Sequence, residues 1–313
     1  MSGFAHIPVM LEECLQGLNL KNGGTYFDGT IGGAGHSYEI LKRTSPSGRL
    51  IATDLDDDAI AAATERLKEF EGRFKIFKSD YKNYGEVFAE ADVTELDGII
   101  LDFGISSWQI DSEERGFSYM KAAAPLDMRM DRTQRLTAEI IVNEYPQKEI
   151  AQILKQYGEE QFANAIAARI VKARAQKRLT TCGELVKIIE EAIPQKFQAG
   201  APAARKSFQA IRIAVNGELN GLYDCVVGIT RSLKKGGRIA ILTFHSLEDR
   251  IVKQAFKFLE ADCICDKSLP VCTCGKKKEI EIITKKPVTA SLKEMAMNSR
   301  SKCAKLRIAE KII

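Results

Sequence analysis

The sequence predicts an α/β protein with a mostly parallel, seven-stranded sheet and an inserted helical subdomain. Over roughly the first hundred residues, short apolar runs alternate with amphipathic helical stretches, and a glycine-rich loop follows the first run. This strand–helix alternation implies parallel strands joined by right-handed crossovers. Residues 104–237 then separate the fourth apolar run from the fifth. A crossover needs only about a dozen residues, so we expect an insertion there.

Seven apolar runs have the length and residue types of buried strands. They are Thr25–Asp28, Arg49–Asp54, Lys75–Ser79, Asp97–Phe103, Arg238–Phe244, Ile280–Thr284 and Lys305–Ile312. Three acids, Asp56, Asp57 and Asp58, follow the second run. Acids suit the N-terminus of a helix, because the helix dipole favours negative charge there. The sequence thus predicts a helix between the second and third strands.

The insertion is predicted to be a mostly helical subdomain over residues 110–205 that recognises the substrate. Residues 1–109 and 206–313 form the domain that carries the sheet. Within the insertion, Gln147–Tyr157 and Gln161–Arg178 have apolar residues at helical spacing.

Two further helices are expected near the end of the insertion. Thr181 and Glu184 form a capping box that opens one helix, and Pro194 ends it. The apolar stripe from Phe208 to Leu222 predicts another helix, which returns to the sheet.

The composition is that of a soluble globular protein. Of the 313 residues, 45% are hydrophobic and 28% charged, which argues against a collagen-like, coiled-coil or wholly disordered chain. Apolar runs fall short of the ~20 residues that a membrane span needs. The first ten residues lack the basic and apolar regions of a secretory signal. We therefore expect a cytoplasmic protein with no membrane partner.

Positive charge is concentrated at the end of the chain. The net charge is +4, but from Gly275 onward eleven Lys and Arg oppose four Glu, so this tail carries +7 and the rest of the chain −3. A basic tail suggests an anionic partner such as nucleic acid. Solubility is the alternative role of such a tail.

The loop from Asp28 to His36 contains four glycines and follows the first predicted strand. Doubly wound sheets bind nucleotides at this position. Asp54 ends the second strand, 19 residues after Gly35, which is the spacing of an acid that bonds a ribose diol. The alternative is a glycine-rich turn followed by a solvated aspartate.

The loop lacks the features of phosphate-binding sites. Gly-Lys-Ser/Thr does not follow it, and Tyr38 occupies the third glycine position of a dinucleotide fingerprint. S-adenosylmethionine, an adenosine ligand without phosphates, fits better. Its ribose can bond Asp54, and its adenine can stack on Tyr81 at the end of the third strand.

Two candidate catalytic residues follow the fourth and fifth strands. Asp102 is either a cofactor ligand, a proton acceptor or the cap of the next turn. Phe103 beside it could stack on a base that has left its helix. After the fifth strand, Ser246 and Asp249 match a capping box, which leaves His245 as a candidate facing the active edge.

Two polar segments of the insertion and its flank have open interpretations. Pro125–Asp131 alternates apolar and charged residues, so as an extended ribbon it is either a lid over the cofactor or a salt-bridged surface. Arg205 and Lys206 could hold phosphates, and Asn216 could bond a base edge. A solvated helix face is the alternative.

Four of the eight cysteines cluster in a C-x-C-x6-C-x-C pattern, namely Cys263, Cys265, Cys272 and Cys274. In a chain of this length and expected compartment, such a cluster indicates metal binding rather than disulfides. The short C-x-C pairs constrain tetrahedral geometry, so they indicate zinc less strongly than two C-x2-C knuckles would. The sequence assigns no metal, and zinc stays open.

Eight segments together resemble the bacterial 16S ribosomal RNA cytosine-N4 methyltransferases, the MraW family, over essentially the whole chain. The segments are HIPVM at 6–10, YFDGTIGGAGHS at 26–37, LDFGISSWQID at 101–111, RGFSYM at 115–120, APLDMRMD at 124–131, YGEEQFA at 157–163, SFQAIRIAVNGEL at 207–219 and LTFHSLEDRIVK at 242–253. Trp108 and Ser299 stand where the family usually has Pro, and Cys303 where it usually has Ser. These departures concern local loop shape.

The resemblance implies a Rossmann-like class I methyltransferase fold, S-adenosylmethionine as donor and 16S rRNA of the small ribosomal subunit as partner. The acceptor would be the N4 amino group of a cytosine in the decoding region, conventionally cytosine 1402. The implied cofactor contacts are Ala34, Gly35, His36, Asp54, Tyr81, Asp102 and Gln109. The resemblance does not identify the catalytic base, and a homodimer is one of the oligomeric states compatible with it.

Other functions stay open at this point. The donor could serve another RNA or a small molecule, and a non-catalytic ribosome assembly factor would need no cofactor loop. A nicotinamide dehydrogenase would need the glycine that Tyr38 replaces.

Overall fold

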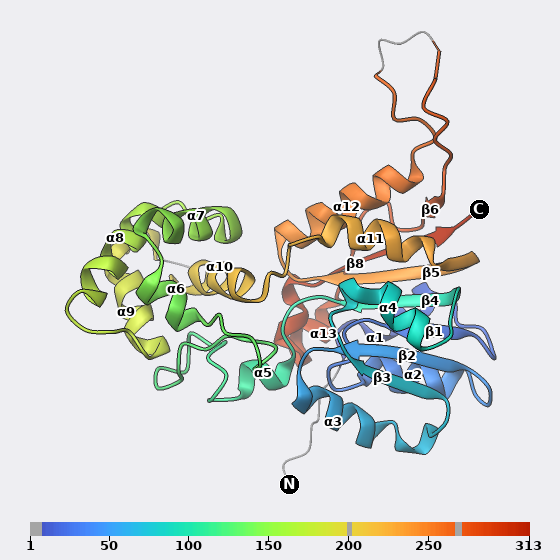
Figure 1. Ribbon diagram of the computed structural model, residues 1–313, viewed down its shortest axis with the longest axis horizontal. Helices are drawn as coiled ribbons and strands as arrows, with labels where there is room; N and C mark the ends of the chain where they lie inside the picture. The colour runs from blue at the N-terminus through green and yellow to red at the C-terminus, as the bar shows by residue number, and fades with distance from the viewer. Residues whose placement is uncertain (1–7, 199–201, 267–270) are drawn as a thin grey trace. The chain divides into compact units, whose positions relative to one another are not determined.

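The computed structural model describes residues 8–198, 202–266 and 271–313. The chain forms two compact units: a sheet unit, Met1–Gly104 with Gly221–Ile313, and a helical unit, Ile105–Asn220. The boundaries thus lie at 104/105 and 220/221, where we had expected 109/110 and 205/206. Both units are labelled by their elements in Figure 1.

The sheet unit contains one sheet with the strand order β3-β2-β1-β4-β5-β8-β6, and β7 also pairs with β8. The first five strands in this order are parallel, whereas β8 is antiparallel to β5, β6 and β7. The strands are β1 (Thr25–Asp28), β2 (Arg49–Asp54), β3 (Phe74–Lys78), β4 (Leu96–Asp102), β5 (Leu233–Thr243), β6 (Ile280–Ile282), β7 (Val288–Thr289) and β8 (Lys305–Lys311). The sheet is mostly parallel, as predicted, but has eight strands rather than seven, because the two-residue β7 is too short to give a periodic pattern.

Helices cover both faces of this sheet. Successive strand residues point to opposite faces, and in β1 Tyr26 packs into the cluster that contains Leu15, Leu18 and Ile40. Phe27, pointing the other way, meets the edge of Phe88 at 5.0 Å between ring centroids. Burial on both faces explains why β1 has two adjacent apolar residues, Tyr26 and Phe27, and why Gly98–Leu101 of β4 is a continuous apolar run.

The helices of the sheet unit include two beside β5 that are easily followed in Figure 1, α11 and α12. The α-helices are α1 (Leu11–Leu18), α2 (Gly35–Arg43), α3 (Asp57–Arg66), α4 (Tyr84–Glu90), α11 (Leu222–Arg231), α12 (Ser246–Glu260) and α13 (Leu292–Met297). Short 3-10 helices are η1 (Lys68–Phe70), η2 (Tyr81–Asn83) and η4 (Ser299–Cys303). Asp56 caps α3 by accepting a hydrogen bond from the Asp58 N–H at 3.1 Å, which confirms the predicted helix start.

The helical unit has a hydrophobic core of its own, built from residues such as Ile141, Leu154, Ile166, Leu185 and Phe208. Its helices are α5 (Ser107–Asp111), α6 (Ala138–Glu144), α7 (Gln147–Gly158), α8 (Ala163–Arg174), α9 (Cys182–Ala192), η3 (Gln195–Phe197) and α10 (Arg205–Asn216). The capping box of Thr181 and Glu184 is confirmed at the start of α9. In the described residues of both units, helices are too short or too polar to cross a membrane.

The predicted single helix from Phe208 to Leu222 is wrong. The stripe belongs to two helices, α10 and α11, which lie in different units. Gly217 ends α10 with a φ of 58°, and Gly221 precedes α11 with a φ of 65°. Both glycines adopt left-handed backbone that other residues disfavour, so the stripe is divided between two helices.

The segment Pro125–Asp131 is not the extended ribbon that its alternation suggested. Met128 has a φ of 61°, and the pairing there is an isolated bridge between Pro125 and Thr181. The alternation in burial does hold, because Leu126 and Met128 are buried while Asp127 and Arg129 are partly exposed. A polar network, rather than a ladder of backbone bonds, therefore shapes this segment.

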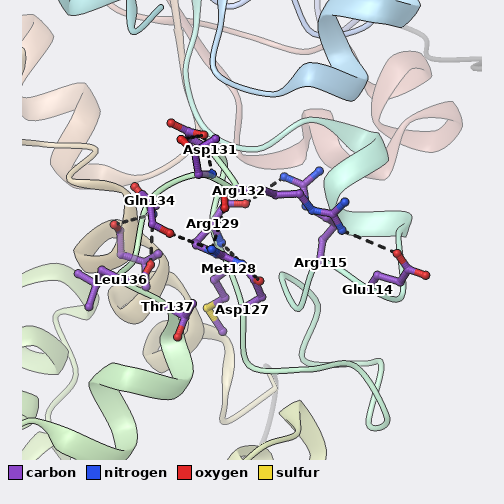
Figure 2. A network of polar contacts seen from close by, with 12 residues as sticks. Glu114, Arg115, Asp127, Met128, Arg129, Asp131, Arg132, Gln134, Leu136 and Thr137 are labelled. Carbon is purple, nitrogen blue, oxygen red and sulfur yellow. Dashed lines mark hydrogen bonds and ion pairs between the residues drawn. The ribbon is translucent and has the colours of Figure 1, made fainter. Parts of the chain in front are cut away.

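Arg129 is the centre of that network (Figure 2). Its Nε and Nη2 donate to the two carboxylate oxygens of Asp127 at 2.9 and 2.7 Å. Its Nη1 donates to the carbonyl oxygens of Arg132 and Gln134, both at 2.8 Å. The planar guanidinium thus cross-links the turn in a way that a lysine ammonium cannot reproduce.

Arg129→Lys should lower the free energy of unfolding by about 2 kcal/mol, because the substitution keeps the charge but loses the bidentate pair and the carbonyl bonds. Urea denaturation of both proteins measures this. Arg135→Lys is the matched control, since Arg135 is exposed and follows shortly after this segment, and it should change stability by less than about 0.5 kcal/mol. Equal stability of the two variants would contradict the role given to Arg129.

Candidate active site and cofactor loop

The loop after β1 is held by the carboxylate of Asp28. This buried group accepts hydrogen bonds from the Thr30 N–H at 3.1 Å and from the Ser37 hydroxyl at 2.6 Å, so it ties the loop to α2. Burial raises the pKa of Asp28 to about 6 despite these bonds. The next residue is Gly29. A Cβ at this position would lie only 2.8 Å from the Cβ of Tyr81, which explains the need for glycine there.

Asp54, predicted to bond a ribose, lies at the end of β2 against the same loop. Its Oδ2 accepts from the Gly32 N–H and its Oδ1 from the Asp56 N–H, both at 2.9 Å. Each carboxylate oxygen has two lone pairs, so these bonds orient the group and leave capacity for two hydroxyl donors. Burial raises the pKa of Asp54 to about 6.

Ala34, Gly35 and His36 form the junction between the loop and α2. Ala34 has a φ of 55°, and its carbonyl accepts from the Tyr38 N–H at 2.9 Å. The Nε2 of His36, which is buried, lies 3.1 Å from the carbonyl oxygen of Val9. His36 therefore fixes α2 against the segment before α1. The first N–H groups of a helix lack intrahelical partners and suit a ligand carboxylate.

Tyr81 and Phe103 stack on each other, with ring centroids 5.4 Å apart and an interplanar angle of 26°. We had expected each ring to stack on a different base. Phe103 is only 4% exposed, so its ring offers little surface to a base in this structure. Tyr81 is partly exposed and stays the candidate for adenine. The stack joins the carboxyl ends of β3 and β4.

Asp102 ends β4 with a carboxyl oxygen that the described chain does not satisfy. Its N–H donates to the Thr30 hydroxyl at 2.7 Å, which couples it to the loop. Its Oδ1 is buried and makes no hydrogen bond to the described residues. Burial, with smaller contributions from Asp28 and Glu248, raises the pKa of Asp102 to about 8. A buried polar atom of this kind indicates a ligand site.

His245 is the N-cap of α12, which corrects the predicted capping box of Ser246 and Asp249. The Nδ1 of His245 accepts from the Glu248 N–H at 3.4 Å, and the Glu248 carboxylate accepts from the N–H of Phe244 at 2.9 Å. Asp249 instead binds Arg307 at 2.7 Å. The His-x-x-Glu spacing is the sequence signal for this capping box, but histidine is a less usual cap residue than serine. A catalytic role for His245 stays a prediction.

Two of the sequence-predicted residues of the helical unit, Gln109 and Asn216, have structural partners within that unit. Gln109 is buried in a capping box with Ser106 at the start of α5. Asn216, which we had expected to face a base, instead donates to the Met128 carbonyl and accepts from the Met130 N–H, both at 2.8 Å. From the sequence alone, a side-chain amide that supports an irregular segment cannot be distinguished from an exposed amide that recognises a base.

Of the two basic residues at the start of α10, Lys206 donates to the carbonyl of Glu159 at 3.3 Å and Arg205 is exposed. Their contact with phosphates stays a prediction.

Comparison with known proteins identifies the chain. Residues 3–312 match the MraW methylase family. The chain belongs to this family. It is 51% identical over 309 residues to "ribosomal RNA small subunit methyltransferase H" of Clostridium botulinum (strain Kyoto / Type A2), covering 99% of each chain. It is 49% identical over 310 residues to the protein of that name from Clostridioides difficile (strain 630), again covering 99% of each.

The cofactor of this methylase is S-adenosylmethionine, and the residues at the carboxyl edge of the sheet fit it. Asp54 has lone pairs for a ribose diol, Tyr81 is a partly exposed aromatic ring, and Asp102 has an unsatisfied acceptor. In register, Asp28 pairs with Ala52 on one side and with Ile100 on the other. Asp54 and Asp102 therefore each extend two residues beyond the end of β1, on either side of the loop.

The Asp102 carboxyl should make stability fall as pH rises. Because its pKa is raised from 3.8 to about 8, the folded protein binds one more proton than the unfolded chain between these values, so the free energy of unfolding decreases with pH in that window. Asp102→Asn lacks this group. The stability difference, variant minus wild type, should increase by on the order of a few kcal/mol between about pH 4 and pH 8. Urea denaturation across this range measures it.

Asp97→Asn is the control from the other end of β4. Although burial alone raises it, hydrogen bonds from Lys234 and the Thr25 N–H lower the pKa of Asp97 overall. Its stabilising contribution is therefore present above the unfolded pKa and is lost as pH falls, so this substitution should destabilise at neutral pH and matter less in acid. The same pH trend in both variants would refute the assignment to Asp102.

Proposed function

We propose that this methylase transfers the methyl group of S-adenosylmethionine to the N4 amino group of a cytosine in the decoding region of 16S rRNA, conventionally cytosine 1402. The relatives that are half identical over the whole chain carry the name of a small-subunit ribosomal RNA methyltransferase. The proposed chemistry is supported by Asp102, whose buried Oδ1 beside the cofactor loop accepts no hydrogen bond from the described residues. Ribosomal RNA as substrate is consistent with activity in the cytoplasm.

The residues that would hold the donor are those at the carboxyl edge of the sheet. Asp54 would accept from the ribose hydroxyls, Tyr81 would stack on the adenine, and the junction of Ala34, Gly35 and His36 would receive the amino-acid end. Gln109 is the remaining proposed contact to the donor, and the family resemblance is its only support. The bound donor supplies an electrophilic methyl group on a positively charged sulfur.

The acceptor nitrogen needs activation, because its lone pair is delocalised into the cytosine ring. A hydrogen bond from the amino N–H to Asp102 would direct the lone pair toward the methyl carbon. Transfer of the donor's methyl group to this nitrogen would release neutral S-adenosylhomocysteine, and Asp102 would take the amino proton. The carboxyl must be ionised for this, and a nearby sulfonium charge favours the ionised form. Holding the two reactants in line contributes several kcal/mol.

The target base must leave its stack to reach this edge, which costs a few kcal/mol. The basic tail, with a charge of +7, and the helical unit would contact the RNA phosphates. In this proposal the helical unit selects the substrate, and Arg205 and Lys206 at the start of α10 take part in that recognition. Binding should accordingly weaken as salt increases.

Asp102→Ala should reduce methyl transfer by roughly 100- to 10,000-fold, the range expected on loss of a general base, with S-adenosylmethionine still bound. Single-turnover transfer of a labelled methyl group measures the rate, and calorimetry measures binding. Asp97→Asn, on the same strand but at its far end, should keep near-normal transfer. Near-normal turnover by Asp102→Ala with bound cofactor would remove Asp102 from the mechanism.

Affinity for S-adenosylmethionine should rise with pH up to about 8, by at most about tenfold per pH unit, because binding a sulfonium beside Asp102 requires that carboxyl to lose its proton. S-adenosylhomocysteine, which has the same adenosine and amino-acid ends but a neutral sulfur, should show a weaker dependence. Calorimetric titrations of both ligands over this range give the comparison. Identical pH dependence for the two ligands would show that Asp102 does not sense the sulfonium.

The acceptor is identified by offering labelled donor with small ribosomal subunits, naked 16S rRNA or neither, and then digesting the RNA to nucleosides. N4-methylcytidine is expected. Another methylated nucleoside would support the alternative of a different RNA target. Label in a small molecule would support a small-molecule methyltransferase, and cofactor retention without transfer would support an assembly factor.

A further inference from the structure

The cysteine cluster between α12 and β6 lies outside the active site just described. This segment is the orange extension in Figure 1. Its four cysteines are free thiols, and their Sγ atoms all lie within 4.8 Å of one another. Cys263 and Cys265 come from the arm that follows α12, whereas Cys272 and Cys274 come from the arm that precedes β6. The fold thus brings together two pairs that the sequence separates.

The sulfur positions match a tetrahedral metal site. The Sγ of Cys272 lies 3.4 Å from that of Cys263, 3.9 Å from that of Cys265 and 3.5 Å from that of Cys274, and Cys263 and Cys274 are 3.9 Å apart. Zinc–sulfur bonds of about 2.3 Å place the corners of a tetrahedron about 3.8 Å apart. The observed separations lie close to this value, although the C-x-C spacing had made a tetrahedral site less expected.

Backbone N–H groups point at the sulfurs. The Ile264 N–H donates to Cys274 at 3.5 Å, the Cys265 N–H to Cys263 at 3.4 Å and the Thr273 N–H to Cys265 at 3.4 Å. Hydrogen bonds of this kind stabilise the thiolate, which is the form that binds metal. They also orient the sulfurs inward, as hydrogen bonds around metal ligands do.

The described part of this segment lacks a hydrophobic core to hold it together. In the described residues 262–266 and 271–278 no side chain is buried, and the apolar Ile264 and Val271 are 55% and 70% exposed. A short extension of this kind usually requires a metal or disulfides for a defined structure. Four thiols in contact, three of them exposed and Cys265 partly exposed, would otherwise be prone to oxidation.

We propose that Cys263, Cys265, Cys272 and Cys274 bind one structural Zn²⁺ ion that cross-links the two arms of this extension. Four thiolates complete a tetrahedral shell, so the ion has no open position for a substrate. Thiolate ligands in a tetrahedral set favour zinc or iron among the common metals, and zinc is the assignment made here. The site is independent of methyl transfer and does not rest on the function proposed above.

The test is the metal content of the full chain, purified under reducing conditions from zinc-supplemented cells and measured by plasma mass spectrometry. A single zinc ion per chain is expected. Cys265→Ser and Cys274→Ser, one substitution in each arm, should reduce it to near zero after dialysis against a chelator. Cys303→Ser, which removes an exposed cysteine outside the cluster, should retain the full amount.

A second measurement on the wild-type protein does not depend on the folding of variants. Replacement by Co²⁺ should give the sulfur-to-metal absorption of a tetrahedral tetrathiolate site, and a thiol reagent should react with the cluster only after the metal is removed. Iron in place of zinc, disulfides among the four cysteines, or wild-type protein without bound metal would each overturn the proposal. Full zinc content in both cluster variants would do the same.

Discussion

Three carboxyl groups at the carboxyl ends of neighbouring parallel strands determine the arrangement of the site. Asp28 ends β1, and in register Asp54 and Asp102 lie two residues further along β2 and β4. Both oxygens of Asp28 and of Asp54 accept hydrogen bonds from the chain, and these bonds shape the glycine-rich loop. The Oδ1 of Asp102 accepts none from the described residues. Two of the acids thus accept bonds that shape the loop, whereas one oxygen of the third is unsatisfied within the described residues.

Parts of this site could be predicted from the sequence because burial on two faces gives parallel strands a continuous apolar pattern. The bounds of β1 and β2 were predicted to the residue, and the acid at the end of β2 followed from its spacing to the loop. Asp28 was overlooked as a structural residue, since a carboxylate that binds its own loop has the same sequence context as one that binds a ligand.

Other predictions failed where polar side chains replace the regular backbone pattern. In Pro125–Asp131, alternation predicted a ribbon, but the guanidinium of Arg129 and the amide of Asn216 hold an irregular turn. At α12, a histidine took the capping role that sequence preference gives to serine. Side-chain hydrogen bonds of this kind depend on residues that are distant in sequence or unusual in their role, so periodicity does not reveal them.

The two acids that flank the loop have different pKa values because their surroundings differ. Burial of its carboxyl raises the pKa of Asp54, but backbone N–H bonds lower it, so the pKa is about 6 and the group is mostly ionised at neutral pH. Asp102 is partly exposed, but its Oδ1 is buried, and burial together with the nearby Asp28 and Glu248 raises its pKa to about 8. Pairs of acids separated in this way commonly divide binding from proton transfer. The low dielectric that disfavours the Asp102 carboxylate also strengthens its hydrogen bonds once it is ionised. In the proposed mechanism, Asp102 would therefore be mostly protonated at neutral pH until a cationic donor binds beside it.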